Sequence, residues 1–85
     1  MDLKTKAKAV KIERIFPGEV KPFGGILRGK CPIHKDSGTP NFTIYPKTNS
    51  WFCFRCGFGG DSIAFWMRWK DVDFKTAIKE LAKIK

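Results

Sequence analysis

The side chains best suited to metal chemistry occur in two closely spaced pairs. Cys31 is followed by His34, and Cys53 is followed by Cys56, with two residues inside each pair and 18 between the pairs. Two soft ligands on each of two tight turns is the spacing of a zinc site, in which four side chains surround the ion tetrahedrally. The sequence therefore predicts one zinc ion bound by Cys31, His34, Cys53 and Cys56.

Other uses of these residues fit the sequence less well. Three cysteines cannot all pair as disulfides, and an intracellular chain keeps its thiols reduced. A redox-active Cys-x-x-Cys requires a βαβ context that this glycine-rich chain does not offer. Inert buried cysteines and an iron site remain minor alternatives. Since four protein ligands leave no open coordination position, we expect a structural zinc ion, and an unfolded or molten chain without it.

The charge of the chain indicates a polyanionic partner. Its 85 residues include 17 Lys and Arg against 8 Asp and Glu, a formal charge of +9. Nucleic acid, an acidic protein or a lipid headgroup would each suit this charge, and a solubilising surface is the alternative. The sequence has no apolar run that predicts a transmembrane helix or a signal peptide, so we expect a soluble, cytoplasmic protein with no membrane partner.

The hydrophobic pattern predicts a small α+β zinc ribbon, with an antiparallel β-sheet and two short C-terminal helices. Residues 1–9 are interpreted as a flexible basic arm, with a short strand as the alternative, and residues 10–85 as the zinc-binding domain. The glycines at 57, 59 and 60 favour a turn whose backbone faces the thiolates over a phosphate loop. Strands are expected at 10–16, 26–30, 41–45 and 51–54, and helices from Asp61 or Ser62 to Trp69 and after Asp73.

Several motifs together resemble the Cys-His-Cys-Cys zinc-binding domain of bacterial-type DNA primases. They are Cys31-Pro32-Ile33-His34, Thr39-Pro40-Asn41-Phe42, Phe52-Cys53-Phe54-Arg55-Cys56-Gly57, Gly59-Gly60-Asp61-Ser62-Ile63-Ala64-Phe65 and the stretch 74–82. The resemblance covers about residues 10–82, with mild departures at Ile33 and Asn41. It implies a zinc ribbon on an antiparallel sheet, zinc ligation by the two pairs described above, and binding of single-stranded DNA template in primer initiation during DNA replication.

No catalytic residues are expected. The family's toprim polymerase domain has no counterpart in this sequence, and the Asp-x-Asp at residues 71–73 falls between two expected helices, where Asp73 is better suited to cap the second. The chain is therefore not expected to act as an enzyme alone or to have a small-molecule substrate. It would act with a polymerase in trans, or it is a stand-alone DNA-binding protein or a fragment of a longer protein. A primase or helicase subunit is a further expected partner.

Single-strand binding needs cations for phosphates and aromatic rings for bases. The expected phosphate contacts are Arg28, Lys30, Lys47 and Arg55. Trp51, beside the expected hairpin turn, is the preferred stacking platform; Tyr45 and Phe54 could stack or pack in the core. The alternative function is a zinc-ribbon protein-interaction module of a replication or transcription assembly, in which the lysines only solubilise.

Overall fold

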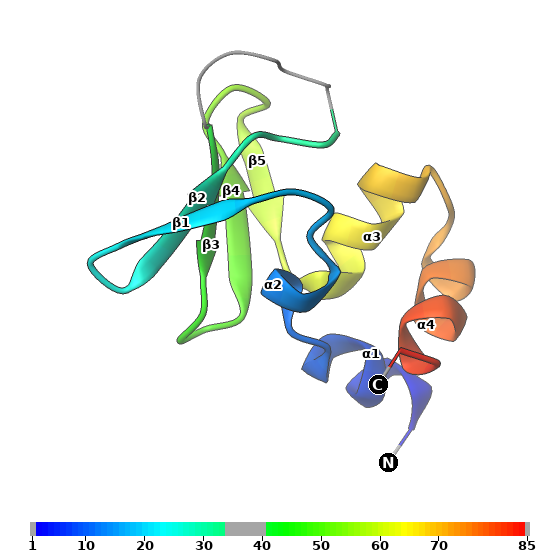
Figure 1. Cartoon of the computed structure of the whole chain (residues 1–85). Helices are drawn as coiled ribbons and strands as arrows, with labels where there is room; N and C mark the ends of the chain where they lie inside the picture. Colours follow the sequence, from blue (N-terminus) through cyan, green and yellow to red (C-terminus); the bar gives the residue numbers. More distant parts are fainter. Residues whose placement is uncertain (1, 34–40, 85) are drawn as a thin grey trace.

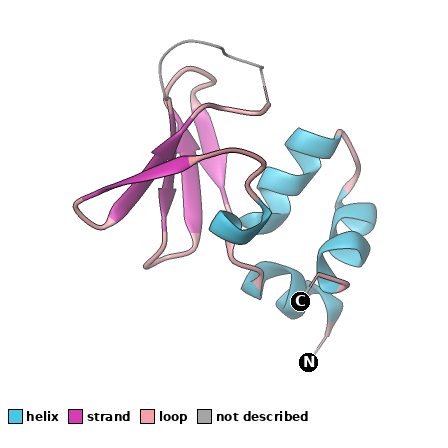
Figure 2. Ribbon diagram, viewed as in Figure 1, coloured by secondary structure: helices cyan, strands magenta, loops and turns pink. Residues whose placement is uncertain are grey.

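The computed structural model describes residues 2–33 and 41–84, and it combines one antiparallel sheet with helices on one of its faces (Figures 1 and 2). This confirms the predicted α+β class with an antiparallel sheet. The elements, in chain order, are α1 (Leu3–Ala9), α2 (Ile12–Ile15), β1 (Val20–Phe23), β2 (Ile26–Gly29), β3 (Phe42–Tyr45), β4 (Ser50–Cys53), β5 (Phe58–Gly60), α3 (Ser62–Lys70) and α4 (Phe74–Ala82).

The five strands lie side by side in the order in which they occur along the chain, and every neighbouring pair is antiparallel. Because successive side chains of a strand point to opposite faces, the register assigns each residue to a face. The row Gly29–Phe42–Cys53–Phe58 lies on the face that the helices cover. The neighbouring row, from Lys21 through Arg28 and Thr43 to Phe52, lies on the opposite face.

Aromatic rings fill the space between the sheet and α3. Phe42 stacks on Trp51 with ring centroids 5.1 Å apart and planes 9° from parallel. Phe65 of α3 meets both rings edge-on, at 5.3 and 5.8 Å. Phe42 and Phe65 are fully buried and Trp51 is 2% exposed. Large aromatic side chains contribute strongly to stability when they are buried, so this cluster fixes α3 to the sheet.

Both C-terminal helices begin where the sequence predicts. The Asp61 carboxylate accepts a hydrogen bond from the backbone N–H of Ala64, 2.9 Å away, and caps α3. Asp73 caps α4 in the same way through Thr76, at 2.8 Å. These are N-cap bonds that satisfy otherwise unpaired backbone donors. Asp73 is therefore a helix cap, as the sequence indicates.

The N-terminal segment differs from the prediction. Instead of a flexible arm at 1–9 and a strand at 10–16, the structure has the helices α1 and α2. Ala7 is fully buried, and α1 packs against α4. The alternating pattern of residues 10–16 was misleading, because Ile12, Ile15 and Phe16 are also spaced by three and four, and this helical spacing buries all three side chains.

Two strands are absent from the sequence prediction. β1 contains Pro22, which lacks a backbone donor, and it lies at the edge of the sheet, where a proline is tolerated. β5 contains two glycines, and a Cβ atom at Gly59 would lie 2.1 Å from the carbonyl oxygen of Trp51. Glycine therefore allows β5 to pair closely with β4. Within the described ranges, every helix is too short or too polar to cross a membrane.

Candidate metal centre and nucleic-acid interface

Three cysteines meet at one end of the sheet. Cys31 follows β2, Cys53 ends β4, and Cys56 lies in the turn between β4 and β5. Their sulfur atoms all lie within 4.8 Å of one another, and those of Cys31 and Cys56 are 3.9 Å apart. Cys31 and Cys53 are almost completely buried. The fold thus brings together residues separated by more than twenty positions in the sequence.

The cysteine cluster has the geometry that a tetrahedral zinc ion requires. With Zn–S bonds of about 2.3 Å, tetrahedral coordination places two ligand sulfurs about 3.8 Å apart. The distance between the Cys31 and Cys56 sulfurs agrees with this value, so the donor set fits zinc. His34, the fourth ligand in the sequence prediction, lies outside the described residues.

The Cys56 thiol resists ionisation unless a cation is present. Burial, together with the neighbouring side chains of Cys53 and Cys31, raises the pKa of the Cys56 thiol to about 12. A divalent cation reverses this preference, because thiolates rather than thiols coordinate metals. Metal binding at this site is therefore linked to the release of protons.

The turn that holds Cys56 depends on one glycine. Gly57 has a φ of 79°, which favours glycine, and its N–H donates a 2.8 Å hydrogen bond to the carbonyl oxygen of Cys53. The N–H of Cys56 also points at the Cys53 sulfur, 3.4 Å away. A backbone donor directed at the sulfur is the arrangement expected of a metal-binding turn. The prediction from the glycines is confirmed for Gly57, whereas Gly59 serves the strand pairing instead.

The structure places the predicted phosphate contacts in two separate regions. Arg28 lies on the helix-free face of the sheet, Lys30 directly precedes Cys31, and Arg55 is exposed in the turn between the other two cysteines. Lys47 is exposed in the turn between β3 and β4, which is at the opposite end of the sheet. The fold therefore groups three of the four cations near the cysteines and separates Lys47 from them.

The prediction that Trp51 is an exposed stacking platform is wrong. Trp51 is 2% exposed, stacked on Phe42, and its indole Nε1 donates a 2.9 Å hydrogen bond to the carbonyl oxygen of Asp61. Proximity to a turn was a poor guide, because strand register decides the face on which a side chain lies. Of the alternatives, Phe54 is 59% exposed and Tyr45 is partly buried.

Sequence reasoning missed two residues on the helix-free face. Phe23 is 56% exposed, and the Arg28 guanidinium lies 5.9 Å from the centre of its ring. Lys21 is directly opposite Arg28 in the β1–β2 register. By sequence pattern, Pro22 disfavours a strand at this position. The alternation of Lys21 and Phe23 on either side of it nevertheless indicates a strand with these two side chains on one face.

A meandering sheet with a buried cysteine cluster at one end, backed by short helices, defines a small metal-binding domain. The chain belongs to the CHC2 zinc finger family, whose sequence model matches residues 3–85. It is thus a zinc-binding domain related to DNA primases, as the sequence motifs predict, and the family match includes the segment that forms α1.

The relatives are much longer proteins. The chain is 38% identical over 65 residues to a DNA primase of Pseudomonas putida, covering 76% of this chain and 10% of that one. It is 34% identical over 84 residues to a DNA primase of Streptomyces coelicolor, covering 95% of this chain and 13% of that protein. The crystal structure of the Aquifex aeolicus primase, with its zinc-binding and RNA polymerase domains, matches 98% of this chain and 21% of that one, with a TM-score of 0.82 and 31% identity. The chain therefore spans about a tenth of the curated primases that it matches.

Proposed function

We propose that this domain binds single-stranded DNA template on the helix-free face of its sheet, and that one structural zinc ion maintains the fold. The zinc ligands in this proposal are Cys31, His34, Cys53 and Cys56. The geometry of the three cysteines and the family membership support zinc, and the spacing of Cys31 and His34 supports the histidine as the fourth ligand. When bound, zinc would offset two of the three thiolate charges and tie the end of β2 to the β4–β5 turn.

The observation that carries the DNA-binding proposal is the composition of the helix-free face. We call its side chains Lys21, Phe23, Arg28, Phe52 and Phe54 the outer surface. Lys21 and Arg28 are register partners, and Phe23 follows Lys21 on the same side of β1. Phe52 and Phe54 form an edge-to-face pair with centroids 5.1 Å apart. The two cations and the exposed ring of Phe23 therefore lie at the β1–β2 side of the outer surface, and the exposed ring of Phe54 lies at the β4 side.

This arrangement suits single-stranded nucleic acid. Unpaired bases stack on aromatic rings, which contributes about 1–3 kcal/mol per base, while cations along the path contact phosphates. The formal charge of +9 attracts the strand from a distance. Arg55, in the turn next to Phe54, extends the cationic path toward the cysteines.

A polymerase domain would perform the chemistry of primer synthesis in this proposal. The described residues offer one metal cluster, and it consists of cysteines that would be saturated as ligands. The domain would therefore position the template for a polymerase supplied in trans or elsewhere in a primase, and a helicase subunit is a further proposed partner. The relatives named above are DNA primases, which supports this assignment.

Fluorescence anisotropy tests the proposal. Zinc-loaded protein is titrated against labelled single-stranded DNA, duplex DNA and RNA over a salt series. We expect a preference for single strands, with log K falling against log salt at about −0.7 for each phosphate contacted. Absence of binding at low salt would contradict the proposal and favour a protein-interaction zinc ribbon.

Matched variants locate the binding surface. Phe54→Ala should weaken binding about tenfold through lost stacking, whereas Phe74→Ala removes a ring that is 44% exposed on α4 and should have little effect. Arg28→Ala should lower both affinity and the salt slope, while Lys75→Ala removes an equal charge from the exposed side of α4. Equal effects within either pair would exclude the outer surface as the binding site.

A further inference from the structure

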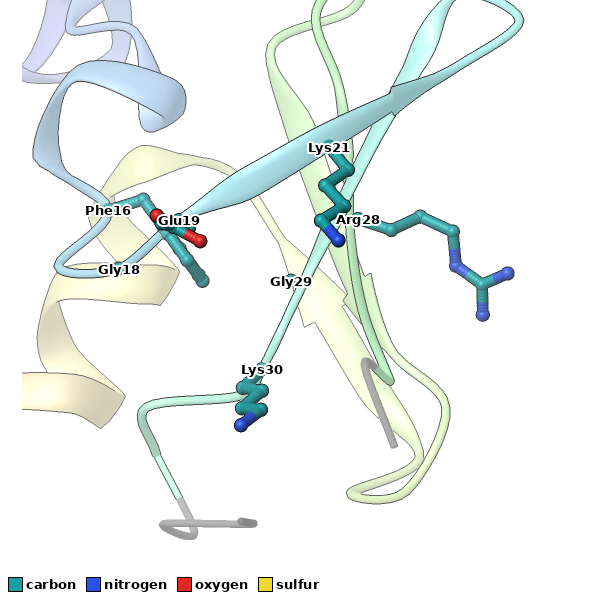
Figure 3. Close-up of a pocket in the computed structure, with 7 residues that line it drawn as sticks. All are labelled: Phe16, Gly18, Glu19, Lys21, Arg28, Gly29 and Lys30. Carbon is teal, nitrogen blue, oxygen red and sulfur yellow. The ribbon is translucent and has the colours of Figure 1, made fainter. Parts of the chain in front are cut away.

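A pocket of about 520 Å³ lies where the chain enters and leaves the edge hairpin β1–β2 (Figure 3). Figure 3 shows Phe16 and Glu19 on one side of the pocket and Lys21 and Gly29 on the other, with Lys30 at one end. Gly18 and Arg28 complete the lining, although the guanidinium of Arg28 extends away from Phe16. The volume is that of a small-molecule site and is much larger than a phosphate ion needs.

Charges of both signs line the pocket. Lys21 and Lys30 contribute two ammonium groups and Glu19 contributes one carboxylate, all three on exposed residues. Within residues 2–33 and 41–84, none of the three takes part in an ion pair. Their hydrogen-bonding groups are therefore available to a ligand that carries an anion at one end and a hydrogen-bond donor elsewhere.

The floor of the pocket is apolar and rigid. Phe16 is 9% exposed and is held by Phe42 and Phe65, with centroids 5.1 and 6.3 Å away. A Cβ atom at Gly29 would lie 2.8 Å from the carbonyl oxygen of Glu19 and 3.1 Å from the Phe16 ring. The missing side chain at Gly29 thus leaves the edge of the Phe16 ring accessible. A preformed apolar floor with a few convergent polar groups is typical of a ligand site.

We propose that this pocket binds a nucleoside 5′-phosphate. The phosphate would lie between Lys21 and Lys30, a sugar hydroxyl or base amino group would donate to Glu19, and the apolar edge of the nucleoside would contact Phe16. A site for phosphate alone gains nothing from Glu19, whose charge repels the anion, whereas a carboxylate is a usual acceptor for ribose hydroxyls. The ligand is either a free mononucleotide or the 5′-terminal nucleotide of a strand.

This inference rests in part on the proposed function, because Lys21 and Arg28 border both the pocket and the outer surface. Its test is an NMR titration of zinc-loaded, ¹⁵N-labelled protein with AMP, inorganic phosphate, and a short oligonucleotide with either a 5′-phosphate or a 5′-hydroxyl. AMP should shift the amide signals of Gly18, Gly29 and Lys30 and bind more tightly than inorganic phosphate. Tighter binding of the 5′-phosphorylated oligonucleotide than of AMP would identify the end of a strand as the ligand. Tighter binding of AMP would identify a free nucleotide as the ligand.

Three variants make the test specific. Lys30→Ala should weaken AMP binding about tenfold through loss of a charge-assisted hydrogen bond, whereas Lys75→Ala, with the same change in charge, should change it less than twofold. Glu19→Gln should weaken AMP binding but not phosphate binding. Equal losses in the two lysine variants, or equal affinity for AMP and phosphate, would overturn the inference. If the 5′-hydroxyl strand binds but AMP does not, the proposed nucleotide site is overturned and the proposed DNA binding stands. If AMP binds but no strand does, the proposed DNA binding is overturned and the nucleotide site stands.

Discussion

The side chain of Asn49 accepts a 3.0 Å hydrogen bond from the backbone N–H of Ile12, 37 residues earlier in the chain. Its amide nitrogen donates to the carbonyl oxygens of Val10 and Lys8, at 2.9 and 3.1 Å. One amide group thus satisfies three backbone groups at the junction between α1 and α2. This contact fastens the N-terminal helices to the β3–β4 turn.

Replacing Asn49 by alanine should destabilise the domain by about 2–4 kcal/mol, since each hydrogen bond contributes about 0.5–1.5 kcal/mol and three are lost. Urea denaturation of the zinc-loaded protein measures the loss. Asn49 also has a φ of 51°, which glycine adopts more readily than alanine. Asn49→Gly should therefore be less destabilising than Asn49→Ala, and Asn49→Asp, which keeps only the acceptor, should also lose stability. A stability loss below about 0.5 kcal/mol in Asn49→Ala would show that the turn holds α2 without this side chain.

Removal of zinc should unfold the domain. Structural zinc contributes about 10–16 kcal/mol in zinc-finger peptides, whereas a whole domain is stable by about 5–15 kcal/mol. A chelator should abolish the near-ultraviolet circular dichroism that packed Trp51 and Phe65 produce, and zinc should restore it. Cys53→Ser should behave like the chelated protein. An unchanged spectrum after complete metal removal would contradict a structural role for the ion.

The identity of the fourth ligand can be tested separately. His34→Cys should retain one zinc ion per chain, because four thiolates also form a closed tetrahedral site. His34→Ala should weaken zinc binding by at least tenfold, since a protein ligand is replaced by water. Competition with a colorimetric chelator measures the amount of zinc bound and the zinc affinity of both variants. Equal zinc affinity in His34→Ala and the unmodified chain would remove His34 from the ligand set.

Zinc binding should depend on pH in a defined direction. The pKa of the Cys56 thiol is raised to about 12 without metal, so this thiol is protonated at pH 7 and must lose its proton when zinc binds. The zinc-linked stability is therefore present at neutral and higher pH, and it decreases as the pH falls and protons displace the ion. Calorimetry of zinc binding in two buffers with different ionisation enthalpies counts the released protons. His34→Cys, which adds a thiol that must also lose its proton, should release more protons than the unmodified chain, and an equal number would contradict this account.

Adding a methyl group at Gly59 should detach β5. The new Cβ atom would lie 2.1 Å from the Trp51 carbonyl oxygen, an impossible contact with backbone. We expect Gly59→Ala to cost more than about 3 kcal/mol, as severe overpacking does. Gly24→Ala is the control, because nothing lies within 4 Å of its Cβ position and only its φ of 53° is unfavourable, at a cost of about 1 kcal/mol. Thermal denaturation should separate the two variants clearly.

Local sequence patterns correctly predicted the features that are determined within a single helix or turn. The α4 residues Ala77, Ile78 and Leu81 follow a helical spacing that agrees with their burial. Asp61 and Asp73 stand at the start of their helices as capping residues should. The Cys53–Cys56 pair was equally readable, since its spacing is typical of a metal-binding turn.

The sequence prediction failed where distant partners decide the structure. Ile12 fits a strand or a helix by its immediate neighbours. Its burial, together with the hydrogen bond that its backbone N–H donates to Asn49 in the β3–β4 turn, selects the helix. Trp51 was assigned to solvent because it lies near a turn, whereas its register opposite Ile44 places it against α3. Neither contact can be inferred from the residues that adjoin Ile12 or Trp51 in the sequence.

The neighbouring positions of α1 and α4 have a consequence for how the chain folds. Each strand pairs with the next strand in the sequence, so the sheet can assemble from local hairpins, which form early. α1 has no such local partner: it packs on α4, and the carbonyl of Ala7 accepts a 2.7 Å hydrogen bond from the Ser62 hydroxyl, 55 residues later. During synthesis on a ribosome, α1 emerges before α3 and α4, so its buried side stays uncovered until both of these helices have been made.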